Sequence, residues 1–187
     1  MEKITLGKVK SIASRISSKV KSDRKDPTGN QNCQLCTWCS EAQFRGVNVL
    51  PRPVYSPRDI IFKFKGDDIV KGGGRQHFKT IDDLKSILEK AEDGARFYAH
   101  VKWRQGNGGH EFIVINVDGK SYLMDSQAGK VIDAFCPASY FNKSDLSMSY
   151  ILRMDTKNFN KDILKYNDMK YCLEWDEEKD MKYLEEN

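Results

Sequence analysis

Residues 109–125 read GHEFIVINVDGKSYLMD, and this stretch decides the fold. The residues on either side of Asp118 and Gly119 are rich in β-branched and aromatic side chains, which favours two strands over 111–117 and 120–125. An Asp-Gly pair between two such runs is the strongest short signal for a two-residue hairpin turn. The centre of the chain is therefore predicted to be an antiparallel hairpin.

Two helical patterns precede this hairpin. Residues 32–45 predict one helix, and Gly46 is the residue type that commonly ends a helix. Thr80 is the expected cap of a second helix, which ends at about residue 94 and has an acidic residue at its third position. Residues 95–103 then return to a period of about two and predict a further strand. Helices followed by an antiparallel sheet indicate the α+β class, with the N-terminal helix of the core packed on the sheet.

The chain is expected to consist of one domain with extensions. A length of 187 residues suits a single core. We expect a basic helical N-terminal extension over residues 1–29, a core domain over 30–155, and an acidic, partly helical C-terminal tail over 156–187. Between the two core helices, residues 59–64 predict a short strand and residues 71–75 a flexible glycine loop.

Composition and charge argue against several classes of protein. A hydrophobic fraction of 39% with 9 Phe, 8 Tyr and 3 Trp is sufficient for a packed interior. No stretch approaches the roughly 18 apolar residues of a membrane span, and no apolar segment follows the basic N-terminus as in a Sec signal. The net charge of +4 is weak evidence for a nucleic-acid partner, which we do not expect. Five cysteines, an odd number, favour reduced thiols in a cytoplasm, or in a target-cell cytoplasm reached by a non-Sec route.

Three cysteines, Cys33, Cys36 and Cys39, lie three residues apart on the first core helix. Three interpretations compete: small buried apolar residues, metal ligands, or a nucleophile. Structural zinc takes four ligands and no fourth is evident nearby, while a ferredoxin run would need a cysteine where Gln43 stands. With Asn32 as N-cap, Cys33 falls in the first helical turn, where backbone N–H groups and the helix dipole lower the pKa of a thiol. Cys33 is therefore the candidate nucleophile, and Cys36 is the alternative.

A nucleophilic cysteine needs a base, and the base needs a group that orients it. A strand begins at His110, directly after residues 106–109, which have no bulky side chains and would admit a substrate. With a two-residue turn, Phe112 pairs with Asp125, so that His110 and Asp125 point to the same face. A buried Asp at this place needs a partner such as an imidazole, although an edge carboxylate facing water is the competing interpretation. Gln127, opposite His110, would help to place Asp125 or polarise a carbonyl.

At these residues the chain resembles the papain-fold toxins of the glutamine deamidase type, which occur in bacterial polymorphic toxins and in phage-encoded proteins. The resemblance spans roughly residues 30–135 and rests on Asn-Cys-Gln-Leu-Cys at 32–36 with Phe-Arg-Gly at 44–46, Gly-His-Glu-Phe at 109–112 and Met-Asp-Ser-Gln-Ala-Gly at 124–129. Each block alone is common, and it is their order together that is specific. The resemblance implies a papain-like cysteine hydrolase fold and a catalytic triad of Cys33, His110 and Asp125; we expect no cofactor and no metal. Members of the family hydrolyse a side-chain amide, typically a glutamine on a target protein, and release ammonia.

The chain departs from the papain pattern at two places. Papain has Trp directly after the second cysteine of its run, whereas Thr37 separates Cys36 from Trp38 here. The oxyanion glutamine six residues before the nucleophile is missing, so that Gln31 or a backbone N–H would have to replace it. A cysteine peptidase of the same fold and a non-catalytic phage or toxin module are the alternative functions. The expected partners are a glutamine-bearing protein substrate and, for a toxin, a cognate immunity or inhibitor protein.

We predict that the purified protein carries no stoichiometric zinc or iron, because its cysteine run lies on one helix stripe rather than on two turns. Elemental analysis of protein purified without chelators measures this directly. One metal ion per chain would contradict the thiol mechanism, since a cysteine held by a metal is not free to act as a nucleophile.

Overall fold

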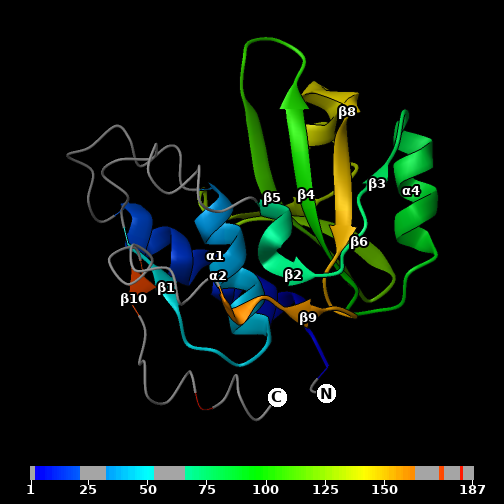
Figure 1. The fold of residues 1–187 in the computed structure, drawn as a ribbon. Helices are drawn as coiled ribbons and strands as arrows, with labels where there is room; N and C mark the ends of the chain where they lie inside the picture. The colour runs from blue at the N-terminus through cyan, green and yellow to red at the C-terminus, as the bar shows by residue number, and fades with distance from the viewer. Residues whose placement is uncertain (1–2, 22–32, 53–65, 163–172, 175–181, 183–187) are drawn as a thin grey trace.

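A six-stranded antiparallel sheet forms the centre of the protein, with helices on both faces (Figure 1). The computed structural model describes residues 3–21, 33–52, 66–162, 173–174 and 182. The strands, in their order across the sheet, are β3 (Gln76–His77), β8 (Ser144–Arg153), β4 (Arg96–Trp103), β5 (Gly109–Val117), β6 (Lys120–Asp125) and β7 (Lys130–Asp133). Each strand pairs antiparallel with its neighbours, which confirms the α+β class.

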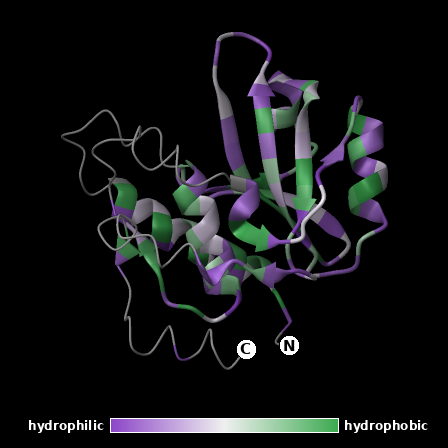
Figure 2. Ribbon diagram, in the orientation of Figure 1, coloured by the Kyte–Doolittle hydropathy of each residue, from purple (hydrophilic) through white to green (hydrophobic). Residues whose placement is uncertain are grey.

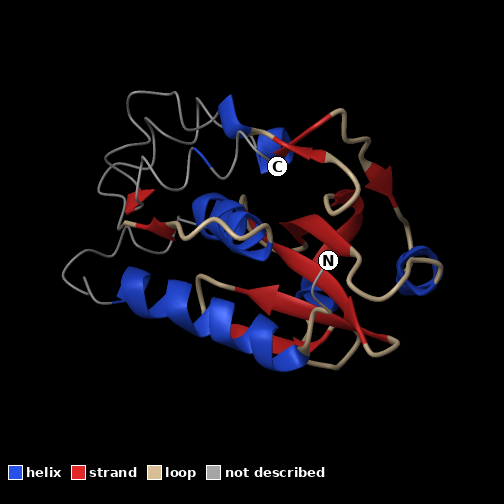
Figure 3. Cartoon of the chain, turned by 90° about the horizontal axis from the view of Figure 1, so that it is seen from below, coloured by secondary structure: helices blue, strands red, loops and turns tan. Residues whose placement is uncertain are grey.

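Two hydrophobic cores lie on opposite faces of this sheet. Helices α1 (Leu6–Lys21) and α2 (Cys33–Phe44) cover one face, and α4 (Ile81–Glu89) covers the other (Figures 1 and 3). Hydrophobic and hydrophilic residues alternate along α4, as expected for a helix with one buried side (Figure 2). The apolar stripe of α1 is part of the same core as α2, and its buried members are Val9, Ile12, Ala13, Ile16 and Val20. The N-terminal helix therefore docks on the core through one face.

Four short strands form two small sheets beside the main one. β1 (Leu50–Pro51) pairs with β10 (Leu173–Glu174), and β2 (Val70–Lys71) pairs with β9 (Asn158–Phe159). Through β9 and β10, the C-terminal part of the chain returns to the segments that flank α2. The strand expected at 59–64 lies outside the described residues, as does most of the tail at 156–187. No helix in the described part of the chain combines the length and apolarity of a membrane span.

The second core helix is shorter than the sequence predicts. Thr80 and the Asp83 carboxylate form the expected capping box, but α4 ends at Glu89 with Lys90 as C-cap rather than near residue 94. The side-chain amide of Asn116 on β5 donates to the carbonyl oxygens of Leu88 and Ala91 at 2.8 and 3.1 Å. These bonds satisfy the terminal carbonyls of the helix from outside, so the helix stops where the sheet supplies a partner.

The long strand β8 was not predicted, although it lies between β3 and β4 in the sheet. Its first half is polar and partly exposed, and its apolar residues are concentrated at its end, where Ile151 and Leu152 are buried. Its pairing with β4 shifts register between His100 and Lys102. A strand with an irregular pattern and an interrupted ladder has no clear period of two, which is why the sequence alone did not reveal it.

A buried ion pair joins α2 to the sheet. The Glu41 side chain is fully buried, and its carboxylate accepts two hydrogen bonds from Arg96 on β4, at 2.7 and 3.0 Å. Arg45, in the turn directly after α2, donates to the same carboxylate at 2.7 Å and to the carbonyl of Met154 at 2.7 Å. A buried charge is tolerated only when its partners are in place, so these contacts specify one seating of α2 on the sheet.

We predict that Glu41→Ala lowers the free energy of unfolding by about 3–5 kcal/mol, because it leaves the buried Arg96 guanidinium without its counter-charge. Chemical denaturation followed by circular dichroism measures the change. Glu89→Ala, at an exposed position on α4, is the matched control and should leave the midpoint nearly unchanged. Equal stability of the two variants would mean that the ion pair does not hold α2 in place.

Candidate active site

Asp125 is the centre of the candidate site. It is the last residue of β6, and its side chain is 2% exposed. Its Oδ2 atom accepts hydrogen bonds from Nε2 of His110 at 2.8 Å and from the hydroxyl of Tyr140 at 2.6 Å, and Oδ1 accepts from the backbone N–H of Ala128 at 3.0 Å. Burial acts to raise the pKa of this carboxyl, but the hydrogen bond and charge of His110, with Tyr140 and Ala128, outweigh it and hold the pKa below its usual value.

The hairpin register places His110 and Asp125 on the same face of the sheet. Asp118 and Gly119 have positive φ angles of 50° and 72°, as a type I′ turn requires, and the ladder runs from Val117 with Lys120 to Ile113 with Met124. His110 and Asp125 lie just beyond the end of this ladder. The expected pairing of the two side chains is therefore present, and it follows from turn position and strand parity.

The contact with Asp125 determines how the His110 ring is used. An ionised carboxylate only accepts hydrogen bonds, so Nε2 carries a hydrogen atom and donates a hydrogen bond to Asp125. In the neutral imidazole this leaves Nδ1 as the acceptor, the form that a general base requires. Both His110 and Asp125 are thus held in the roles expected of the orienting pair of a triad.

Aromatic side chains surround the His110 ring. Trp103 at the end of β4 stacks on it with 6.1 Å between ring centroids and 16° between planes, and Tyr140 meets it edge-on at 5.1 Å. Phe112 lies below it at 6.0 Å, and only 16% of the His110 side chain is exposed. These rings limit the access of water to the pair and so strengthen its electrostatic interaction.

The glycines before His110 have packing roles. A Cβ atom on Gly109 would lie 2.5 Å from the carbonyl oxygen of Val101, which is too close for any side chain. A Cβ atom on Gly108 would lie 3.5 Å from the Trp103 ring. Close approach of β4 and β5 thus requires Gly109, whereas a side chain at position 108 would make an ordinary contact with the indole. The expectation that this stretch admits a substrate stays a prediction.

Cys33 is the first residue of α2 and is partly exposed. The backbone N–H groups of Glu111 and Gln34 and the charges of Glu111 and Asp125 act on its thiol, which places the sulfur near the start of β5. The N-terminus of the first core helix and the start of the His110 strand therefore meet near the sulfur.

The thiol therefore lies near β5 on the α2 face, whereas the His110 ring points to the α4 face with Phe112. Among the described residues no hydrogen bond joins Cys33 to His110, so the structure brings His110 and Asp125 together but does not place the thiol on the imidazole.

The expected lowering of the Cys33 pKa is wrong for this structure. Burial and, next, the negative charge of Glu111 raise the pKa of the Cys33 thiol to about 12, and Asp125 acts in the same direction. The N–H groups of Glu111 and Gln34 lower it but do not offset burial. Cys33 is thus a neutral thiol in the resting protein.

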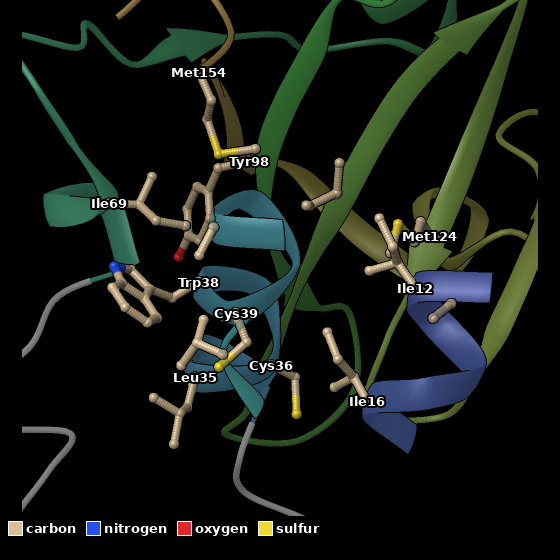
Figure 4. Packing of buried hydrophobic residues seen from close by; sticks show 14 of the residues in the cluster. Ile12, Ile16, Leu35, Cys36, Trp38, Cys39, Ile69, Tyr98, Met124 and Met154 are labelled. Atoms are coloured by element: carbon tan, nitrogen blue, oxygen red, sulfur yellow. The ribbon is translucent and has the colours of Figure 1, made fainter. Parts of the chain in front are cut away.

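The other two cysteines of the run are core residues. Cys36 and Cys39 are 1% and 0% exposed, and Figure 4 shows them among apolar side chains such as Leu35 and Ile16. Burial raises the pKa of both thiols well above the usual range. The small-apolar interpretation therefore holds for Cys39, and burial disfavours Cys36 as the alternative nucleophile. No group of residues in the described part of the chain is arranged to hold a metal ion.

Glu111 forms a second polar cluster that sequence reasoning missed. Its side chain is 6% exposed and points to the α2 face, opposite to His110. Its Oε1 atom accepts from Nε2 of Gln34 at 2.9 Å and lies 3.3 Å from Nδ1 of His100. Within the described residues, Oε2 has no hydrogen-bond partner. Strand parity next to His110 was the signal that could have placed this carboxylate near Cys33.

Tyr140 was also missed, and no local signal in the sequence would have revealed it. It lies fifteen residues after Asp125, in the 3₁₀ helix Tyr140–Lys143 between β7 and β8. Gln127 is partly buried in the turn after Asp125, and its proposed role stays a prediction. Gln31 and Asn32 lie outside the described residues.

Comparison of the chain with protein-family models, with curated proteins and with solved structures gave no match.

We predict that Glu111→Gln speeds the alkylation of Cys33 by iodoacetamide about threefold to tenfold at neutral pH. Removal of the negative charge beside the sulfur lowers the thiol pKa and so increases the thiolate fraction. Peptide mapping by mass spectrometry measures the rate at Cys33 alone. The matched control is Glu89→Gln, which should alkylate like the parent protein, and an unchanged rate in Glu111→Gln would show that this carboxylate does not act on the thiol.

Proposed function

We propose that the protein is a papain-like cysteine hydrolase that attacks an amide through Cys33, His110 and Asp125. The observation that carries the proposal is the 2.8 Å contact from Nε2 of His110 to Oδ2 of Asp125, and the charge of Asp125 also acts on the thiol of Cys33. A thiol at a helix N-terminus, a base on an adjacent strand and a carboxylate that orients the base form the arrangement of a cysteine nucleophile. A central antiparallel sheet with this helix packed on it is also consistent with a papain-like fold.

The proposed reaction requires the His110 ring to approach the sulfur, and it begins with transfer of the Cys33 proton to Nδ1 of His110 while the sulfur attacks the amide carbon. A neutral resting thiol suits this step, because the proton is then available for the leaving group. The imidazolium, held by Asp125, donates the proton to the departing nitrogen, and a thioester on Cys33 remains. Water then attacks the thioester with His110 as base, which releases a carboxylate and restores the thiol.

The backbone at the start of α2 supports the oxyanion. The first N–H groups of a helix have no partner within the helix, and Cys33 is the first residue of α2. Such N–H groups are suitable donors for the negative charge that develops on the carbonyl oxygen during the attack. They are the backbone alternative to the missing papain glutamine.

Deamidation of a glutamine side chain on a target protein is the preferred reaction, as the resemblance to the papain-fold deamidase toxins implies. A free thiol nucleophile is suited to a reducing cytoplasm. A peptidase of the same fold differs only in which amide reaches Cys33.

We predict that incubation with a cell lysate adds about 1 Da per reacted glutamine to a target protein, because an amide nitrogen is replaced by oxygen. High-resolution mass spectrometry of the lysate proteins identifies both the target and the residue. Cys33→Ala, His110→Ala and Asp125→Ala should each lose the modification, whereas Cys39→Ala is the matched cysteine control and should retain it. Cleaved chains in place of the mass increase would assign a peptidase, and modification by Cys33→Ala would exclude the mechanism.

A further inference from the structure

Tyr140 has the geometry of a fourth member of the candidate site. Its hydroxyl donates to Oδ2 of Asp125 at 2.6 Å, the same oxygen atom that accepts from Nε2 of His110 at 2.8 Å. The proposed triad uses the contact of Asp125 with His110 but not the contact of Asp125 with Tyr140. The hydrogen bond from Tyr140 therefore needs a separate explanation.

The Tyr140 ring is held in place from several sides. It meets the rings of His110, Trp103 and Phe112 at centroid distances of 5.1, 5.8 and 5.4 Å, each in an edge-on arrangement. Lys130 on β7 lies over the ring at 5.0 Å from its centroid. On the main chain, the hydroxyl of Ser144 donates to the Tyr140 carbonyl oxygen at 2.7 Å. The short contact with Asp125 is thus supported by the packing of the whole side chain.

The hydroxyl is a permanent donor. Burial and, next, the hydrogen bond and charge of Asp125 raise the pKa of Tyr140 far above its usual value, so that the phenol keeps its proton at any physiological pH. A hydrogen bond from a neutral phenol to a carboxylate is a strong, charge-assisted bond. It withdraws negative charge from Oδ2 that would otherwise act on His110 alone.

Resting on the proposed function, we propose that Tyr140 is a positioning residue of the active site, which shares the charge of Asp125 with His110 and so keeps the imidazole available as a neutral base. Without this sharing, the carboxylate would hold the imidazolium more tightly. A base that is already protonated cannot accept the Cys33 proton. The orientation of the carboxylate does not depend on Tyr140 alone, because the N–H of Ala128 holds Oδ1.

The other charged or titratable groups around the pair are few. Cys33 on α2 interacts electrostatically with both Asp125 and Glu111, and Lys130 faces Tyr140. Glu111 points to the opposite face of β5 and contacts His100 and Gln34. Removal of the Tyr140 hydroxyl alone leaves all of these groups in place, so a change at His110 is attributable to the lost donor.

The test is the titration of His110 by NMR in the parent protein and in Tyr140→Phe. The substitution should raise the pKa of His110 by about half a unit to one unit, because the full charge of Asp125 then stabilises the imidazolium. The acidic limb of the pH–rate profile should move to higher pH by the same amount. Tyr122→Phe, at a partly buried position on β6 that faces α1 and α2, is the matched control and should leave the His110 titration unchanged.

A double-mutant cycle separates charge sharing from a structural role. In an Asp125→Asn background, Tyr140→Phe should no longer shift the His110 pKa, because no carboxylate charge remains to be shared. An unchanged His110 pKa in Tyr140→Phe, or an equal shift in both backgrounds, would overturn the proposal. If Tyr140→Phe does not fold, ¹⁹F NMR of fluorotyrosine-labelled protein replaces it: Asp125→Asn should then make Tyr140 ionise at lower pH, and an unchanged titration would overturn the proposal. These titrations need no substrate, so a protein that shows the shift but hydrolyses no amide would contradict the proposed function and leave the charge sharing intact.

Discussion

The seating of α2 on the sheet depends on the buried Glu41 carboxylate. Arg96 from β4 and Arg45 from the turn after α2 both donate to it, and Arg45 also donates to the carbonyl of Met154. An apolar interface tolerates small shifts of a helix, because dispersion and burial have no direction. A buried charge that needs several donors does not tolerate them, since each lost bond leaves an unsatisfied ion. The ion pair therefore specifies where the first turn of α2, and with it Cys33, meets β5.

The start of β5 is the place where both faces of the sheet contribute to the candidate site. His110 points to the α4 face and pairs with Asp125, whereas Glu111 points to the α2 face and lies beside Cys33. The two carboxylates have opposite effects on the proposed chemistry. In the proposed reaction Asp125 would stabilise the imidazolium, whereas Glu111 disfavours the thiolate in the resting protein. Burial and Glu111 thus favour a neutral thiol in the resting protein.

Local patterns predicted the hairpin well and the electrostatics of the thiol poorly. The turn residues Asp118 and Gly119 and the two-residue period were enough to bring His110 and Asp125 to one face, because parity is rigid once the turn forms. The pKa of Cys33 could not be predicted in the same way. A helix N-terminus lowers it, but burial and the charge of Glu111 act more strongly, and neither is visible from the position of Cys33 in its helix.

The sequence by itself determined the α+β class, the capping box of α4, the hairpin, and the pairing of His110 with Asp125. Each of these depends on residues that are close in the chain, where backbone geometry leaves few alternatives. The tertiary structure alone decided the place of β8, the contact of Tyr140 with Asp125, and the burial of the cysteine run. These depend on which distant segments exclude water from one another, and that is a property of the packed chain that no local window contains.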